Sequence, residues 1–277
     1  MHRSLSCRTI ATTLLLLLAL PLVAQQPATD KPAKTRKPGA TIDVVFVGNS
    51  YTFYHDLPAM VRALGSADQP ARQVTTTMLA PGGFTLAQHW DATGKDAPRT
   101  VLKEKRPDFV VLQEQSRMAL DNPSQLQQSA AKWAELLTKQ KATPVWYMTW
   151  ARQAEPAAIE RIADEYGKAC KAGGGRLAPV GRAFEAALRE PGLQLHDADG
   201  SHPSPLGSYV AACVLYATMT GSDVTTFPDK LVVPGEDGKE RVLVELPAAT
   251  GKRLREAAAK SLAAAATIGA KGTAGGK

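Results

Sequence analysis

The stretch that decides the fold is VVFVGNSYTFYHDLP, residues 44–58. An apolar run that begins at Ile42 ends at Gly48, and Ser50 follows two residues later. A continuous run of β-branched residues is typical of a strand in a parallel sheet, because both faces of such a sheet are covered by helices. Ser50 would then stand at the carboxyl end of a buried strand, either as a nucleophile or as a polar residue of a turn.

Strand and helix signals alternate along the rest of the chain. This alternation predicts an α/β fold, a three-layer α/β/α sandwich with a mainly parallel sheet and helices on both of its faces. A hairpin over 231–246 and a final Ala/Lys-rich helix are expected after it. The expected strands are 42–47, 72–79, 108–112, 144–149 and 176–180, and the expected helices are 57–67, about 123–138, 157–174 and 204–221.

The two ends of the chain differ from its middle. Residues 1–24 are typical of a secretory signal, since two arginines precede a short apolar core and Ala24 offers a small residue for cleavage. A membrane anchor is the alternative, but the apolar stretch is shorter than the roughly 20 residues that span a bilayer. We therefore expect a secreted or periplasmic protein without stable membrane insertion. Residues 25–40 are predicted to be a disordered basic linker, 41–267 one domain, and 268–277 a flexible tail.

The formal net charge of +7 belongs largely to these ends. The remaining domain is closer to neutral and has no basic stripe with interleaved aromatic residues, so no nucleic-acid partner is expected. Without the signal, the cysteines are Cys170 and Cys213, which a disulfide could join or which could both be core thiols. Their spacing suggests no metal site. The basic residues near the ends are Arg3, Arg8, Lys31, Lys34, Arg36, Lys37, Lys271 and Lys277.

Polar or glycine-rich residues follow three of the predicted strands. Ser50 follows the first strand, the pair Gly82–Gly83 the second, and the segment 113–115, Gln-Glu-Gln, the third. In open parallel sheets, active sites lie beyond the carboxyl ends of the strands. These three segments are therefore expected to converge on one crevice.

The second informative stretch is LHDADGSHPSPLGSY, residues 195–209. Asp199 precedes His202 by three residues, and Gly200 between them allows a tight turn. A carboxylate placed so can bind one imidazole nitrogen and leave the other to take a proton from a serine. The alternative is a polar loop at a helix start, in which the histidine only caps the helix. The G-x-S-x-G motif of α/β-hydrolases is absent, because Thr52 stands where its second glycine would be.

These residues resemble the SGNH (GDSL-like) hydrolase superfamily, and the resemblance covers most of residues 42–221. GNSYT resembles the family's first block, PGGFT supplies the glycine of the second, and Asp199-Gly-Ser-His202 resembles its last block, D-x-x-H. The resemblance implies a flavodoxin-like fold, Ser50 as nucleophile, His202 as base and Asp199 as its orienting acid. It also implies an oxyanion hole built in part from the backbone N–H groups of Ser50 and Gly83.

One block departs from the family pattern. Its third block normally carries an asparagine whose side chain donates to the oxyanion, whereas this chain has VVLQEQSRM. A glutamine amide offers the same donor on a longer stem. Either Gln113 or Gln115 could fill the role, and we expect Gln113, the first polar residue after the strand.

The substrate is expected to be a small-molecule or glycan ester, with no cofactor or metal. No long apolar lid is evident, which favours short acyl groups. Trp150 and Arg152 follow a strand end, where they could contact a sugar and a carboxylate. The alternative is that Trp150 is a core residue and Arg152 a surface charge. A carbohydrate O-acetylesterase is the first hypothesis, followed by a general carboxylesterase. An acyltransferase of the same fold or a non-catalytic glycan-binding module are the alternatives.

Overall fold

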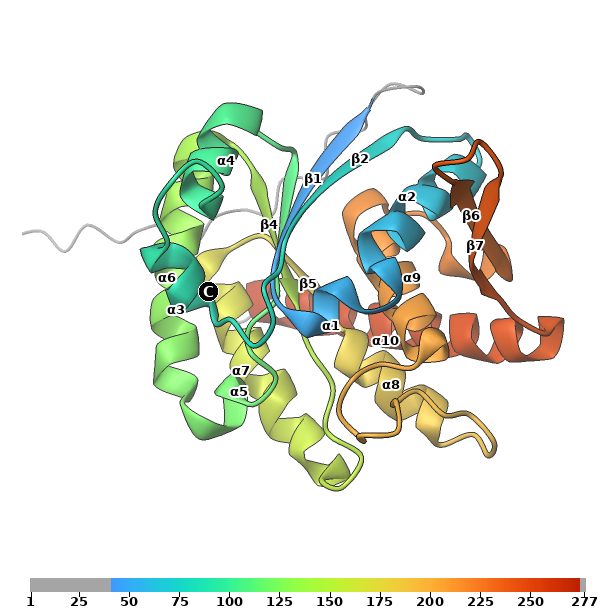
Figure 1. The fold of residues 1–277 in the computed structure, drawn as a ribbon. Coiled ribbons are helices and arrows are strands. Elements are labelled where there is room, and N and C mark those ends of the chain that lie inside the picture. Colours follow the sequence, from blue (N-terminus) through green and yellow to red (C-terminus); the bar gives the residue numbers. More distant parts are fainter. Residues whose placement is uncertain (1–40, 275–277) are drawn as a thin grey trace, which may run out of the picture. The chain divides into compact units, whose positions relative to one another are not determined.

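Five parallel strands form the central sheet of the computed structural model, in the order β2-β1-β3-β4-β5 (Figure 1). The structure describes residues 41–274. All five expected strands are present, and the α/β fold class is confirmed. The strands are β1 (Ile42–Val47), β2 (Val74–Leu79), β3 (Phe109–Leu112), β4 (Thr143–Tyr147) and β5 (Arg176–Ala178).

Helices cover both faces of this sheet and make three layers (Figure 1). Side chains alternate along β1, so that Val44 and Phe46 enter one apolar core and Val45 and Val47 enter the other. The first core is shared with α2 (Leu57–Ala67), α8 (Val180–Leu188), α9 (Pro205–Thr220) and α10 (Ala248–Ala274). The second is shared with α3 (Leu86–Asp91), α4 (Pro98–Lys105), α6 (Pro123–Gln140) and α7 (Ile159–Gly173).

Helix α9 begins and ends where its sequence predicts. The side chain of Ser204 accepts a hydrogen bond from the Gly207 N–H, and Pro205 occupies the first helical position. Gly221 ends the helix with φ 74°, a left-handed conformation that glycine adopts without steric cost. Because α9 follows directly on the loop that holds Asp199 and His202, this firm start anchors that loop.

Short elements complete the fold. The expected hairpin is formed by β6 (Lys230–Pro234) and β7 (Glu240–Glu245). Two one-turn helices lie near strand ends, α1 (Ser50–Phe53) and α5 (Met118–Asp121). Three 3₁₀ turns are η1 (Tyr54–Asp56), η2 (Pro156–Ala158) and η3 (Val224–Thr226).

The chain ends are only partly described. The predicted signal, 1–24, and linker, 25–40, lie outside the described residues. Helix α10 runs to Ala274, past the point at which we expected a flexible tail to begin, and its many alanines favour the helix. Cys170 and Cys213 are not joined by a disulfide. Within residues 41–274, no helix is both long and apolar enough to cross a membrane.

The strand order determines where a crevice opens at the edge of the sheet. In the order 2-1-3-4-5 the chain turns to opposite faces of the sheet after β1 and after β3, which opens a crevice between their carboxyl ends. Ser50 follows β1 and the Gln-Glu-Gln segment follows β3, so both border that crevice.

Candidate active site

Ser50 is the first residue of α1, in a tightly packed turn after β1. Asn49 caps this helix: its Oδ1 accepts from the Tyr51 N–H at 3.2 Å, and its Nδ2 donates to the Phe84 carbonyl at 2.9 Å. Gly48 has no room for a side chain, because a Cβ there would lie 2.3 Å from Thr52 Oγ1. The sequence Gly-Asn-Ser thus fixes the Ser50 hydroxyl and ties its turn to the Gly83 loop.

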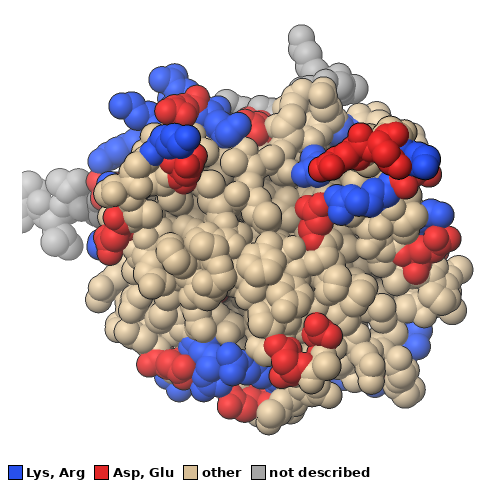
Figure 2. All heavy atoms as spheres, viewed as in Figure 1, with Lys and Arg blue, Asp and Glu red and all other residues tan. Residues whose placement is uncertain are grey.

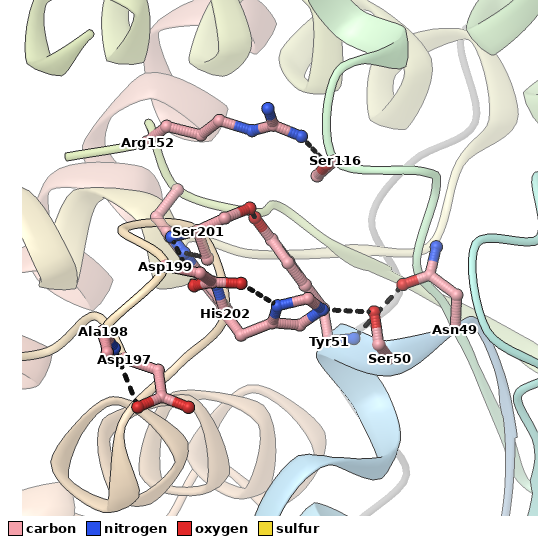
Figure 3. A network of polar contacts seen from close by, with 11 residues as sticks. Asn49, Ser50, Tyr51, Ser116, Arg152, Asp197, Ala198, Asp199, Ser201 and His202 are labelled. Carbon is pink, nitrogen blue, oxygen red and sulfur yellow. Dashed lines mark hydrogen bonds and ion pairs between the residues drawn. The ribbon is translucent and has the colours of Figure 1, made fainter. Parts of the chain in front are cut away.

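The structure brings Ser50, His202 and Asp199 together (Figure 3). Ser50 Oγ lies 2.9 Å from His202 Nε2, and His202 Nδ1 is hydrogen-bonded to Asp199 Oδ2. Serine and histidine are 152 residues apart in sequence. The juxtaposition expected from the two motifs is therefore present in the fold, while the catalytic roles of the three residues stay predictions.

Asp199 lies in a compact loop that places its carboxylate behind the imidazole. Its Oδ1 accepts from the backbone N–H groups of Ser201 and His202, each at 2.9 Å. Gly200 takes φ 66°, as expected of the tight turn, and the Asp197 N–H donates to the His202 carbonyl at 2.7 Å. The hydrogen bond from His202, aided by the two backbone donors, lowers the pKa of Asp199 to about 2, so it is a carboxylate at neutral pH.

Aromatic rings hold the imidazole from the side. The Tyr54 ring stacks on the His202 ring with centroids 4.3 Å apart and planes 8° apart. The Tyr51 ring meets the same imidazole edge-on at 5.6 Å. These contacts were not anticipated from the sequence, although both tyrosines stand in the quoted SYTFY stretch directly after the serine.

Gln113 was the wrong choice for the oxyanion donor. Its side chain is fully buried; Oε1 accepts from the Asn49 N–H and from Thr52 Oγ1, both at 2.9 Å, and Nε2 donates to the Glu114 carbonyl. The backbone direction at the end of β3 turns this side chain inward beneath the Ser50 turn. Gln113 therefore supports that turn and cannot reach a substrate.

Gln115 and Gly83 are the remaining candidates for the oxyanion hole. Gln115 is half-buried, and its Oε1 accepts from the Arg117 N–H at 2.8 Å, which leaves Nε2 without an acceptor among the described residues. Gly83 is exposed with φ 73°, and its N–H likewise has no acceptor within residues 41–274. Both keep the donor that a developing oxyanion requires.

Trp150 does not face the crevice. It is 1% exposed and lies between the rings of Tyr51 and Phe184, at 4.4 and 4.1 Å, with Nε1 donating to the Ser201 carbonyl at 3.0 Å. Its ring joins the apolar core, where removal of its apolar surface from water is favourable. The prediction that Trp150 stacks on a sugar is wrong.

Arg152 is half-buried and lies near Ser116. Its Nη2 donates to Ser116 Oγ at 3.3 Å, while its buried Nε has no partner (Figure 3). It makes no ion pair with a carboxylate in the described part of the chain. Arg152 also lines a cavity of about 940 Å³, together with Gln153, His196 and α8, and neither Ser50 nor His202 lines that cavity.

Two buried polar residues lie beside the site, and neither was assigned a specific role from the sequence. His89, 2% exposed, has Nε2 2.7 Å from the Gly48 carbonyl, and Glu114, fully buried, accepts from two backbone N–H groups. Glu114 stands in the segment 113–115 that was expected at the crevice, whereas His89 left no local sequence signal, since it is 41 residues from Gly48. Among the described residues, no group of three His, Cys, Asp or Glu side chains could hold a metal ion.

Fold and site define an α/β protein with a Ser-His-Asp set at the β1–β3 switch point of a parallel sheet. A structure from Slackia heliotrinireducens, assigned to the SGNH hydrolases, is 30% identical in sequence, with a TM-score of 0.55; the match covers 65% of this chain and 100% of the other. The chain belongs to the SGNH hydrolase superfamily.

Two more distant structures share the fold. A DUF4886 family protein from Bacteroides uniformis is 18% identical with a TM-score of 0.62, and the match covers 81% of this chain and 95% of the other. A catalytic mutant of Axe2, an acetylxylan esterase from Geobacillus stearothermophilus, is 15% identical with a TM-score of 0.51, over 67% and 97% of the two chains. No protein-family model and no curated protein matches the chain.

Proposed function

We propose that the chain is an exported serine esterase that cleaves short acyl esters, chiefly acetyl esters, on carbohydrate. The observation that carries the proposal is the hydrogen-bonded series from Ser50 Oγ through His202 to Asp199. Membership of the SGNH hydrolases supports hydrolysis, and the shared fold of an acetylxylan esterase is consistent with an acetylated glycan. The signal-like residues 1–24 support export.

The geometry suggests a two-step reaction. His202 Nε2 accepts the Ser50 proton while Oγ attacks the ester carbonyl carbon, and the imidazolium is stabilised by Asp199. When the tetrahedral intermediate collapses, His202 returns the proton to the leaving alcohol oxygen and an acyl-serine remains. Water then attacks the acyl carbon, His202 takes its proton, and the carboxylic acid leaves as Ser50 regains its hydrogen.

The oxyanion would be held by three donors. We assign the N–H of Ser50, the N–H of Gly83 and the Nε2 of Gln115, each of which has no acceptor among the described residues. The Ser50 N–H belongs to the first turn of α1, where backbone donors have no intrahelical partner. Asn49, by bonding the Phe84 carbonyl, keeps the Gly83 loop beside this turn.

Arg152 is proposed to contact the substrate. Its side chain is half-buried, has no carboxylate partner in residues 41–274 and is linked only weakly to Ser116. A guanidinium in this state keeps several N–H donors for a carboxylate or a sugar oxygen. Arg152 would contribute to substrate affinity and not to proton transfer, since His202 is the residue that protonates the leaving alcohol.

The test is hydrolysis of p-nitrophenyl acetate, followed by acetate release from a panel of acetylated polysaccharides. Ser50→Ala is expected to remove ester cleavage with the fold intact. Retention of more than about one per cent of the wild-type kcat/KM would reject Ser50 as the nucleophile. An active enzyme that releases no acetate from any glycan in the panel would reject the carbohydrate substrate alone.

A further inference from the structure

An exposed aromatic side chain lies on the same short helix as the nucleophile. Phe53, the last residue of α1, is 38% exposed. Four large hydrophobic side chains in the described part of the chain are exposed to this degree or more, and Phe53 is the only aromatic one. The other three are Met78, Leu188 and Val242.

Phe53 is placed toward the triad by the geometry of α1. Residues three apart on a helix are neighbours on one face, so Phe53 lies beside Ser50. The Phe53 ring stacks on the Tyr54 ring with centroids 5.6 Å apart, and Tyr54 in turn stacks on His202 at 4.3 Å. Phe53 is thus the outer, solvent-facing member of an aromatic row that ends on the imidazole.

The turn that follows Phe53 is strained, and contacts from distant elements hold it. His55 and Asp56 have φ of 52° and 53°, a left-handed conformation that side chains other than glycine rarely adopt. His55 Nδ1 lies 2.9 Å from Ser208 Oγ on α9, and Asp56 pairs with Arg241 on β7. Backbone strain of this kind persists where the surrounding structure fixes it, and it tends to occur at functional sites.

The surface around this row is largely uncharged apart from Asp56, which is paired with Arg241 (Figure 2). Figure 2 shows the face on which α1 lies in Figure 1, with Lys, Arg, Asp and Glu gathered near its edge and uncharged residues over its centre. An aromatic ring in such surroundings suits an uncharged ligand with an apolar face. The C–H face of a pyranose ring meets this description, because packing it on an aromatic ring removes apolar surface from water.

The aromatic row also lies on the side of the reacting carbonyl from which the alcohol leaves. In the proposed reaction His202 protonates the leaving alcohol, so that alcohol must leave next to the imidazole. The oxyanion donors of Gly83 and Gln115 come from other loops, those after β2 and β3. The alcohol part of the ester is therefore the part that meets Tyr54 and Phe53.

We propose that Phe53 is the platform on which a neutral pyranose of the ester's alcohol part stacks, a subsite that makes glycan esters better substrates than simple esters. This inference rests on the proposed esterase function. In this proposal the sugar stacks on Phe53, which is exposed to solvent, and not on Trp150, which is buried.

The experiment compares Phe53→Ala and Phe53→Leu with the wild type on an acetylated xylo-oligosaccharide and on ethyl acetate, whose alcohol part carries no ring to stack on Phe53. Both variants should lose about tenfold in kcat/KM on the oligosaccharide, the loss of one stacking contact, and stay within about twofold on ethyl acetate. Phe53→Trp should retain activity on both. Val242→Ala, which removes another exposed side chain, is the matched control and should change neither.

A second measurement does not need the glycan ester to be cleaved. Unacetylated xylotetraose should inhibit hydrolysis of p-nitrophenyl acetate by the wild type, and about tenfold more should be needed with Phe53→Leu. Equal losses on both substrates, or no loss on the oligosaccharide, would overturn the subsite. Failure of the esterase proposal is seen separately, as Ser50→Ala retaining activity.

Discussion

His202 is held on three sides by contacts that differ in kind. Asp199 binds Nδ1, Ser50 lies 2.9 Å from Nε2, and Tyr54 stacks on the ring face. The low pKa of Asp199 keeps its charge available when the imidazole becomes protonated. Each contact removes one freedom of the ring: its tautomer, its direction and its tilt.

At the same scale, Gln115 and Gln113 should respond differently to replacement. Gln115→Ala should lower kcat about 10²–10³-fold, since it removes one oxyanion donor, and should leave the melting temperature unchanged. Gln113→Ala should instead lower the free energy of unfolding, because it leaves the Asn49 N–H buried and without its acceptor. Steady-state kinetics and thermal unfolding of both variants check this pair. A kcat for Gln115→Ala within tenfold of the wild type would remove Gln115 from the oxyanion hole.

Glu114 connects two elements that border the site. Its Oε1 accepts from the Leu86 N–H, at the start of α3, at 3.0 Å and from the Gln115 N–H at 2.7 Å, whereas its buried Oε2 has no partner. Burial raises the pKa of Glu114 from 4.5 to about 7, despite these two donors. The carboxyl therefore changes charge near neutral pH while joining α3 to the loop after β3.

This arrangement makes a prediction about stability and pH. A pKa that is higher in the folded than in the unfolded protein gives stability that is present below pH 4.5 and is lost as the pH rises through 7. Wild type should therefore lose up to about 3 kcal/mol between pH 4.5 and 8 that Glu114→Gln does not lose. Urea unfolding of both proteins across this range measures the difference. The same difference at every pH would show that Glu114 does not titrate in this range.

The elements that the sequence predicted share a strong local pattern. The run 42–47 is apolar on both faces, and α9 has a serine cap and a terminal glycine, so each agreed with the structure to within a residue. Helices α3 and α4 were not predicted, because they are short and each buries only two residues, Leu86 and His89 in one and Pro98 and Leu102 in the other. Thr85 and Gln88 form a capping box at the start of α3, and Pro98 lies in the first turn of α4, but helices this short depend on packing for their stability.

The site was predictable in the same uneven way. Asp199 and His202 are close in sequence, so their spacing alone predicted their contact. The choice between the two glutamines depended on the path of the chain after β3, where the alternation of a strand no longer applies. Trp150 was misplaced for the same reason, since it lies beyond the end of β4 at Tyr147.

Across the whole molecule, Trp150 joins three segments that are distant in sequence. Its ring lies between Tyr51 on α1 and Phe184 on α8, and its Nε1 donates to the Ser201 carbonyl in the loop that holds Asp199 and His202. Trp150→Ala should lower the free energy of unfolding by about 3–5 kcal/mol, the usual cost of removing a buried tryptophan. Denaturant unfolding followed by circular dichroism checks the value. A variant as stable as wild type but with a raised KM for glycan esters would show that Trp150 contacts the substrate.

The hydrogen bonds of the 197–202 turn have a mechanical consequence. Asp199 binds the imidazole and the amide of His202 at once, and Asp197 closes the turn by bonding the His202 carbonyl. Asp199 and His202, the proposed acid and base, therefore belong to one rigid turn, whereas Ser50, the proposed nucleophile, lies on a separate element, α1. A displacement of this turn would lengthen the distance between His202 Nε2 and Ser50 Oγ and leave the Asp199–His202 hydrogen bond intact. The proposed proton transfer would then be lost at this one contact and restored when the turn moved back.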